Sequence, residues 1–288
     1  MHIILGGTGH VGSALAENLI EQREPVTIIT RDPSKARDWQ QKGAQVAVAD
    51  VDDTEALRRS FERGKRLFLL NPPADPSTDT DAEERRSLAS IFAAIDDSGL
   101  EKIVAESTYG AQTGNGIGDL GILYEMEESL NARDIPSSII RAAYYMSNWD
   151  MSLATAKDEG MIHSFYPADF KLPMVAPHDL GQAAARLMTE PVEQTGTHHV
   201  EGPQQYSPSD VAAAFCSALG KDVKVNVIPR DQWAQSFKGL GFSDAAAKSY
   251  SGMTAVTLDK SYKLHESPVK GKISLEEYIT ELVNRNAS

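Results

Sequence analysis

The sequence predicts an α/β protein with a doubly wound parallel sheet and a smaller C-terminal α/β lobe. Short apolar runs alternate with amphipathic stretches through the first half of the chain, as a parallel sheet with crossover helices requires. Several runs are β-branched and apolar at consecutive positions, which suits strands covered on both faces. We expect strands at residues 3–5, 26–30, 46–49, 67–70, 103–105 and 138–141.

Helices are expected between these strands. Pro33 follows Asp32 as a proline in the first helical turn does, and Gly99 stands where a helix ends. The predicted helices cover residues 11–22, 33–42, 54–63, 81–97 and 122–132. Six strand–helix units in about 140 residues predict a doubly wound sheet.

After Arg141 the pattern loosens, and residues 142–177 are rich in aromatics without clear periodicity. A helix at 178–189 and a strand at 198–200 can complete the sheet. Beyond Ser207 we expect a helix to residue 218, a strand at 223–227 and further helices. The predicted division is a cofactor-binding domain at 1–150, completed by 178–200, and a substrate-covering lobe at 151–177 and 201–288.

Composition narrows the class of protein. Hydrophobic residues make up 41% and charged residues 24%, as in ordinary globular domains. No apolar run approaches the ~20 residues that span a bilayer, and Met1-His2 leads straight into a short apolar run without a basic leader segment. We therefore expect a cytoplasmic protein. The lone cysteine, Cys216, lies in an apolar helical setting and is expected to be buried and inert.

The net charge is −13, from 28 basic and 41 acidic side chains, and no Lys/Arg cluster is visible. Direct nucleic-acid binding is therefore disfavoured. The acidic stretch at 75–84 is interpreted as a solvated loop and helix start, and Asp179 as a first-turn helix charge. The histidines show no metal-ligand spacing, so we expect no metal site.

A glycine-rich loop stands at the N-terminus. Residues 6–12, Gly-Gly-Thr-Gly-His-Val-Gly, contain G-x-G-x-x-G between a predicted strand and an amphipathic helix, the context that marks a Rossmann dinucleotide loop. Such glycines permit the tight turn and let the backbone approach a pyrophosphate at the helix N-terminus. An unliganded glycine turn is the alternative. The predicted cofactor contacts are Gly6, Thr8, Gly9, His10, Val11 and Gly12.

The residue after the second strand indicates the phosphate preference. NAD-selecting proteins usually have an acid there that holds the ribose 2′-hydroxyl, whereas this chain has Arg31. A guanidinium can pair with a 2′-phosphate in fork geometry, and Lys35 lies nearby. We therefore predict NADP(H), with NAD(H) as second choice. Arg31 as a solvated loop charge is the alternative.

The next two strand ends are expected to add cofactor contacts. Asp50 and Val51 follow the third strand, where an acid can accept from the adenine amino group, although an exposed helix cap is nearly as good an interpretation. Asn71, Pro72 and Pro73 end the fourth strand, where a nicotinamide riboside would lie. The prolines remove backbone donors and can form a wall there, or simply end the strand.

These features together resemble the NmrA-like branch of the atypical short-chain dehydrogenase/reductases, over nearly the whole chain. Family members include NAD(P)H-dependent quinone and triphenylmethane-dye reductases and catalytically silent NADP sensors that regulate partner proteins. The resemblance implies a Rossmann fold and an NAD(P) cofactor. The residues that carry it are the glycine loop, segment 30–36, Glu127-x-x-Leu130, Ile135-Pro136, and Arg141 followed by Tyr144-Tyr145-Met146.

The catalytic pattern of the wider superfamily is incomplete here. That pattern is a Ser, a Tyr and a Lys four residues after the Tyr, because the ammonium lowers the tyrosine pKa and holds the ribose. The candidates are Ser107, which is also expected to contact the cofactor, Tyr124 and Glu127, but Glu128 stands where the lysine should be. Leu123 stands where reductases of the family often have His or Lys. Glu127 matches the acid of the family's helix, with an exposed helix charge as the alternative.

This departure favours chemistry that needs little acid–base help, since a quinone or an extended dye cation can accept hydride directly. Aromatic side chains at high density suit flat conjugated molecules, although each is singly more often core. The glycine-rich connection at 110–121 is expected to be a mobile lid. The predicted substrate contacts are Tyr109, Tyr144, Tyr145, Met146, Trp149 and Phe165.

The leading hypothesis is therefore an NADPH-dependent reductase of a quinone-like or other conjugated aromatic small molecule. A catalytically silent NADP(H) redox sensor that acts through a protein partner is the alternative. The missing Tyr/Lys pair favours the sensor, and the aromatic wall favours the enzyme. A sugar-nucleotide or isoflavone-type reductase is a third interpretation. Neither nucleic acid nor membrane is an expected partner.

Overall fold

The computed structural model describes residues 1–286, and an eight-stranded parallel sheet forms their centre. The strand order is β13-β10-β6-β5-β4-β1-β2-β3, so the chain reverses direction across the sheet between β1 and β4. This confirms the predicted doubly wound α/β fold. The strands are β1 (His2–Leu5), β2 (Val26–Thr30), β3 (Gln45–Val48), β4 (Arg66–Leu69), β5 (Lys102–Thr108), β6 (Ser137–Ala142), β10 (Gly196–Glu201) and β13 (Val269–Lys270).

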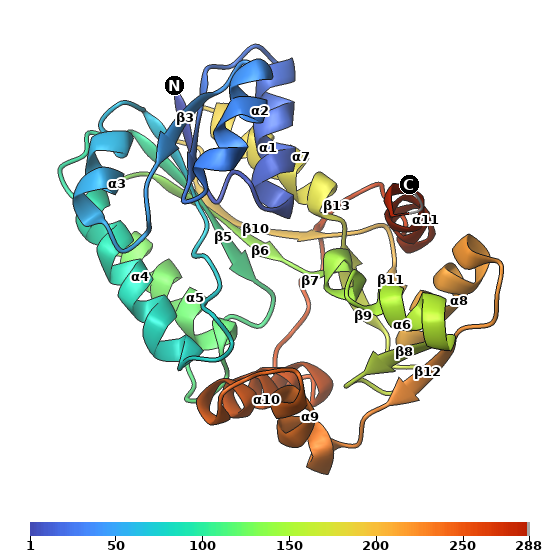
Figure 1. Ribbon diagram of the computed structural model, residues 1–288. Coiled ribbons are helices and arrows are strands. Elements are labelled where there is room, and N and C mark those ends of the chain that lie inside the picture. The colour runs from blue at the N-terminus through green and yellow to red at the C-terminus, as the bar shows by residue number, and fades with distance from the viewer. Residues whose placement is uncertain (287–288) are drawn as a thin grey trace.

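Helices cover both faces of this sheet (Figure 1). One face carries α1 (His10–Glu21) and α7 (Pro177–Thr189). These two helices pack so closely at Gly181 that a Cβ there would lie 2.5 Å from the Ala14 Cβ. The other carries α3 (Thr54–Phe61), α4 (Thr80–Ile95) and α5 (Asp119–Asn131). The short η1 (Pro33–Lys35) and α2 (Ala36–Gln41) connect β2 to β3. Each face has its own apolar core, which explains the continuous apolar strands.

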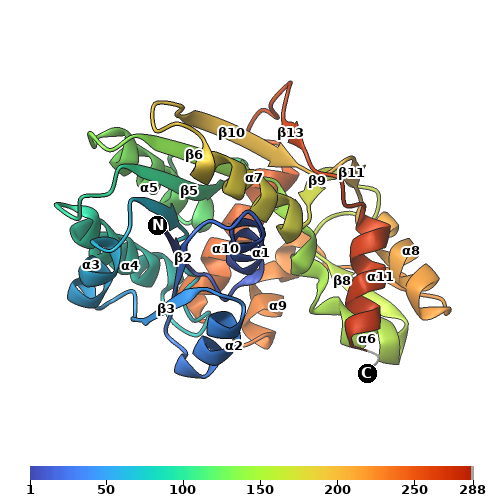
Figure 2. The same ribbon diagram turned by 90° about the horizontal axis from the view of Figure 1, so that it is seen from above.

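The remaining elements form a lobe beside the sheet (Figure 2) and an α-helical pair, α9 and α10. Within residues 1–286 the lobe holds two small sheets, β11-β9-β7 and β12-β8. Its elements are β7 (Tyr144–Tyr145), η2 (Met146–Trp149), α6 (Ser152–Glu159), β8 (Met161–Ser164), β9 (Leu172–Val175), β11 (Gln205–Tyr206), α8 (Pro208–Leu219), β12 (Lys224–Val227), η3 (Arg230–Gln232), α9 (Trp233–Gly239), α10 (Asp244–Leu258) and α11 (Leu275–Arg285).

Two side chains, Cys216 and Glu84, differ from their predicted settings, and a third, Asp179, has a contact that was not predicted. Cys216 lies on α8 but is half-buried, with its sulfur 3.1 Å from the Val223 amide nitrogen. Asp179 lies in the first turn of α7, as predicted, but it is also buried and accepts bonds from the backbone amides of residues 272 and 273, so it fastens the segment after β13 to α7. Glu84, expected in a solvated stretch, is buried beneath the loop that follows β4. The Asp179 contact comes from a segment distant in sequence, whereas the Cys216 and Glu84 contacts come from the loops next to their own helices.

Two further observations concern the edge of the central sheet and the helices. The sheet takes its edge strand, β13, from the segment assigned to the substrate-covering lobe. The predicted division into domains therefore stays a prediction. Among the helices in residues 1–286, none combines the length and the apolar character needed to cross a membrane.

Candidate functional site

The glycine loop closes tightly after β1 and leaves the start of α1 open. Gly6 has a left-handed φ of 72°, and the Gly9 amide donates to its carbonyl at 3.0 Å. A Cβ at Gly12 would lie 2.3 Å from the Gly6 oxygen, so only glycine fits there, whereas a Cβ at Gly9 would meet nothing closer than 3.4 Å. Gly9 is exposed on the outer side of the turn. A ligand can therefore approach where Gly9 lies, but a side chain at Gly12 would break the loop.

The helix start has the electrostatic character of an anion site. Gly9 caps α1 without a side-chain hydrogen bond, and no acidic residue lies in the first turn. The first-turn amides are therefore free of the side-chain partners that usually satisfy them, and the helix dipole favours an anion. His10 is exposed, Thr8 is half-buried and Val11 is buried.

Arg31 follows β2, the strand next to β1, and is exposed. The neighbouring acid, Asp32, turns away from it: its carboxylate accepts from the Ser34 amide at 2.9 Å and from the Ser34 hydroxyl at 2.6 Å. These two bonds lower the pKa of Asp32. Lys35 is exposed on η1. The carboxyl end of β2 therefore presents cations to solvent.

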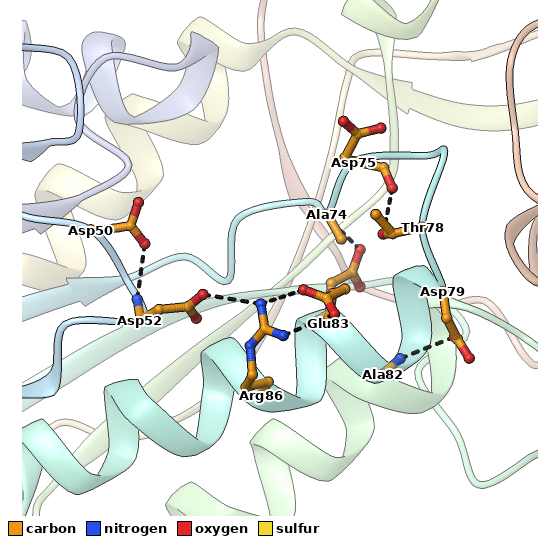
Figure 3. Close-up of polar contacts among 10 residues, drawn as sticks. Asp50, Asp52, Ala74, Asp75, Thr78, Asp79, Ala82, Glu83 and Arg86 are labelled. Atoms are coloured by element: carbon orange, nitrogen blue, oxygen red, sulfur yellow. Dashed lines mark hydrogen bonds and ion pairs between the residues drawn. The ribbon is translucent and has the colours of Figure 1, made fainter.

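The loop after β3 is tied to α4. The Asp50 carboxylate accepts from the Asp52 amide at 3.0 Å, and Asp52 pairs with Arg86 at 3.1 Å. Figure 3 shows Arg86 between Asp52 and Glu83, its second carboxylate partner. Val51 is half-buried against the α3/α4 core. Asp50 is exposed and follows β3, and the helix-cap interpretation of it is wrong, because Asp53 caps α3 and accepts from the Ala56 amide at 2.9 Å.

Asn71 lies two residues after the end of β4, next to the carboxyl pair Glu84 and Asp119. Its amide donates to the Glu84 carbonyl at 3.3 Å, and its Oδ1 is buried without a partner in residues 1–286. The Ala74 amide donates to the Glu84 carboxyl at 3.1 Å. Burial, and then the nearby Asp119 charge, raise the pKa of Glu84 to about 8. Of the prolines, Pro72 is half-buried and Pro73 is exposed.

Ser107, Glu127 and Arg141 form a closed network on the α5 face. The Ser107 hydroxyl donates to Glu127 at 2.5 Å, and the Arg141 guanidinium donates to both oxygens of the same carboxylate at 2.9 and 2.6 Å. The bond to Glu127 raises the pKa of Arg141, and the nearby Tyr124 adds to the rise. The alternative that Glu127 is an exposed helix charge is wrong, because it is buried. The predicted catalytic residues do gather, but Ser107 and Glu127 satisfy each other.

A second carboxyl group, missed by the sequence prediction, lies one residue earlier on β5. Glu106 is buried, and the Tyr145 hydroxyl donates to its Oε1 at 2.5 Å. Its Oε2 has no partner within residues 1–286. Burial raises the pKa of Glu106 to about 7, partly offset by the Tyr145 bond. A charged residue that directly continues the apolar run 103–105 was the available signal, but the predicted strand ended at residue 105.

The predicted aromatic wall separates into different surroundings. Tyr144 and Tyr145 are half-buried beyond the end of β6. Tyr109 is buried, and its hydroxyl donates to Glu201 at 3.2 Å. The others lie in apolar cores of the second half of the chain: Met146 and Trp149 with almost no exposed surface, and Phe165 stacked on Phe237 with centroids 4.3 Å apart.

The glycine-rich connection packs against α10. The Gly118 amide donates to the Ser249 hydroxyl at 2.9 Å, and a Cβ at Gly252 would lie 2.0 Å from the Gly116 oxygen. Ser249 in turn donates to Asp81 of α4 at 2.5 Å. The connection is therefore held between α4 and α10, and its proposed motion stays a prediction.

Comparisons with known proteins agree with this architecture. The chain is similar to the NAD(P)H azoreductase of Xenophilus azovorans, at 23% identity over 258 residues, covering 89% of this chain and 87% of the relative. It is similar to quinone oxidoreductase 2 of Escherichia coli (strain K12), at 25% identity over 250 residues, covering 86% and 84%. The solved structure of Citrobacter sp. triphenylmethane reductase complexed with NADP(H) has a TM-score of 0.81 at 18% identity, covering 98% and 100%.

The last comparison decides the family. The family model described as NmrA-like matches residues 2–279, which is nearly the whole chain. This confirms the resemblance carried by the glycine loop and the Arg141 segment. The protein belongs to the NmrA-like family.

Proposed function

We propose that the protein is an NADPH-dependent reductase that transfers hydride to a quinone-like or other conjugated aromatic acceptor. The observation that carries this proposal is the open N-terminus of α1 at Gly9. It follows β1, and the exposed Arg31 follows the neighbouring strand β2, so both lie at the carboxyl ends of the strands. In doubly wound sheets, ligands bind at the carboxyl ends of the strands, where the strand order reverses. Here that point lies between β1 and β4.

In this proposal the strand ends divide the cofactor between them. The first turn of α1 holds the pyrophosphate, and Arg31 with Lys35 pairs with the 2′-phosphate, so that NAD(H) is the poorer ligand. Asp50 and Val51 lie toward the adenine, and Asn71 and the prolines toward the nicotinamide riboside. The bound cofactor supplies the hydride, while the chain binds and orients it.

The nature of the acceptor follows from the polar groups around β5. The closed network of Ser107, Glu127 and Arg141 holds no free acid or base. An acceptor that takes hydride with little acid–base help from the α5 face suits such a network. The names of the similar proteins, an azoreductase, a quinone oxidoreductase and a triphenylmethane reductase, describe conjugated acceptors.

The same closed network supports a second candidate, a silent NADP(H) sensor that acts through a protein partner. A screen of NADPH oxidation against quinones, dyes and aldehydes separates the two. The enzyme turns over at least one acceptor, whereas NADPH binding with no turnover of any acceptor favours the sensor.

A glycine substitution tests the cofactor site in the same experiment. We expect Gly9→Val to stay folded and to lose NADPH binding by calorimetry, because its side chain occupies the space of the pyrophosphate. Gly239→Val is the matched control: a Cβ at Gly239 meets nothing within 4 Å, at the end of α9. Unchanged NADPH affinity in a folded Gly9→Val variant contradicts the placement of the site.

A further inference from the structure

Glu106 is a buried carboxyl group that the proposed function does not use. Its register partner on β6 is Ile140, and on the other side Leu70 follows the last paired residue of β4. A position between two apolar neighbours normally holds an apolar residue, because a buried carboxylate is costly unless it is paired. Glu106 forms no ion pair within the part of the chain that the structure describes. Packing alone does not account for a glutamate here.

Tyr145 is the hydrogen-bond partner of Glu106, and it lies beyond the carboxyl end of β6. It belongs to β7, which begins two residues after β6 ends and brings the phenol back over β5. Tyr145 is half-buried, whereas Glu106 is buried. Any proton exchange between Glu106 and a molecule at the carboxyl end of β5 would pass through Tyr145, the one hydrogen-bond partner of Glu106 in residues 1–286.

The other charged groups around this pair are acidic or turned elsewhere. From α5, the Asp119 charge helps to raise the pKa of the Tyr145 hydroxyl, and Asp119 itself lies next to the Glu84 carboxyl of α4. From α1, His10 faces Asp150, and from α7, Asp179 accepts from backbone amides. No cation thus holds Glu106 in its charged form.

Two pKa shifts describe the consequence. Burial raises the pKa of Glu106 to about 7, so this carboxyl gains and loses its proton near neutrality. Burial, and then the Glu106 charge, raise the pKa of Tyr145 well above its ordinary value, so Tyr145 stays a neutral phenol. A protonated Glu106 can donate to the Tyr145 oxygen, which leaves the phenol hydrogen to point away from Glu106.

We propose that Tyr145 is the proton donor to the reduced acceptor and that Glu106 is a positioning residue that supplies the replacement proton. This inference rests on the proposed function. A quinone gains a hydride with its electron pair as one C–H bond of NADPH breaks and NADP⁺ leaves. The Tyr145 O–H bond breaks to protonate a quinone oxygen, Glu106 reprotonates Tyr145, and solvent reprotonates Glu106. The sum is one quinone, one NADPH and one proton giving one hydroquinone and one NADP⁺.

Two acceptors separate the proton step from the hydride step. A neutral para-quinone needs a hydride and a proton, whereas a cationic triarylmethyl dye needs a hydride alone. The full chain is assayed with both at saturating NADPH, as wild type, Tyr145→Phe and Glu106→Gln. Tyr206→Phe is the matched control, since it removes a buried hydroxyl from β11 in the second lobe.

We expect Tyr145→Phe to lower the kcat for the quinone by about 10², the typical contribution of a positioned proton donor, and to leave the kcat for the dye within about twofold. Wild-type quinone reduction requires protonated Glu106, so its kcat falls as pH rises above about 7. In Glu106→Gln this fall disappears. Tyr206→Phe matches wild type with both acceptors.

Equal losses with both acceptors in Tyr145→Phe overturn the inference, because a merely structural role affects hydride transfer to either. An unchanged pH profile in Glu106→Gln also overturns it. In both cases wild type still reduces the two acceptors, so the proposed function stands. Wild type that reduces neither overturns the proposed function and this inference together.

Discussion

Glu106 and Glu127 are equally buried, each 4% exposed, yet their surroundings differ. Consecutive residues of a strand point to opposite faces, so Glu106 and Ser107 open onto separate networks. On the α5 face, Ser107 and Arg141 together give Glu127 three hydrogen bonds. On the α1 face, Tyr145 is the one partner that Glu106 has in residues 1–286, and one oxygen has none.

The comparison shows that burial alone does not set the role of a carboxyl group. A buried carboxylate with a bidentate arginine holds the surrounding elements together, and removing its partner is costly. A buried carboxyl without a cation exchanges its proton near neutral pH. Two consecutive residues of β5 thus have different surroundings: Ser107 contacts the Glu127–Arg141 ion pair, and Glu106 is a carboxyl group whose pKa burial raises.

The largest expected effect comes from breaking the network of Ser107, Glu127 and Arg141. Arg141→Ala leaves Glu127 buried and uncompensated, so we expect the free energy of unfolding to fall by about 3–5 kcal/mol, measured in urea. Arg85→Ala removes a comparable bidentate pair with Glu125 at the exposed surface and serves as the control, with an expected loss below about 1 kcal/mol. Similar losses in the two variants would show that Glu127 reaches water once Arg141 is gone.

Glu106, which has no cationic partner, is expected to lower the free energy of unfolding in a pH-dependent way, whereas the Glu127–Arg141 pair raises it. The pKa of Glu106 rises from its ordinary 4.5 to about 7 on folding. Between these values the folded protein binds more protons than the unfolded chain, so this group lowers stability as pH rises through the interval. The rise corresponds to up to about 3 kcal/mol above pH 7.

Glu106→Gln removes this cost. We expect the variant to be more stable than wild type by up to about 3 kcal/mol above neutrality, and to match wild type below the ordinary glutamate value. Urea unfolding across the pH range measures the difference between the two proteins. A difference that does not change with pH would mean that Glu106 keeps one protonation state throughout, and the contrast with Glu127 would lose its basis.

Arg31 is a third kind of charged group, an exposed cation whose proposed partner is the 2′-phosphate of the ligand. If Arg31 pairs with the 2′-phosphate, Arg31→Ala weakens NADPH by about 1.5–3 kcal/mol, roughly ten- to a hundredfold, and hardly changes NADH. Arg63, exposed beyond α3, is the matched control. Dissociation constants at low and higher salt measure the effect, which shrinks with salt at an exposed site. Equal losses for both cofactors would show that Arg31 only stacks on the adenine.

The sequence predicted the sheet because its first six strands carry dense apolar patterns between recognisable helices. The observed ends differ from the predicted ones by only a few residues, as for β5, which continues to Thr108. The edge strand β13 was missed, since two exposed residues hold no apolar pattern. The same holds for the second lobe, where β8 is paired by β12 from sixty residues away, and no local pattern encodes such a pairing.

The candidate site shows the same limit. Residues that follow strands, such as Arg31 and Asn71, were placed correctly at the sheet edge because strand direction fixes their position. Met146 and Trp149 were expected in a substrate wall, but aromatic density does not say which face of a lobe a ring fills, and both lie in a core. Glu106 needed a tertiary contact to be recognised, because the Tyr145 hydroxyl comes from another element.

The smallest expected effect concerns Tyr124. This phenol lies near the Glu127–Arg141 pair, whereas Tyr145 is bonded to Glu106. Glu128 stands where a lysine would assist Tyr124, and it is exposed, whereas Glu127 is buried. We therefore expect Tyr124→Phe to lower the kcat of quinone reduction by less than about tenfold, below the usual contribution of a general acid. Stopped assays at saturating NADPH, beside Tyr145→Phe, compare the two phenols directly. A loss of about a thousandfold with intact NADPH affinity would make Tyr124 the proton donor, and the α5 face, not the α1 face, would then carry the proton chemistry.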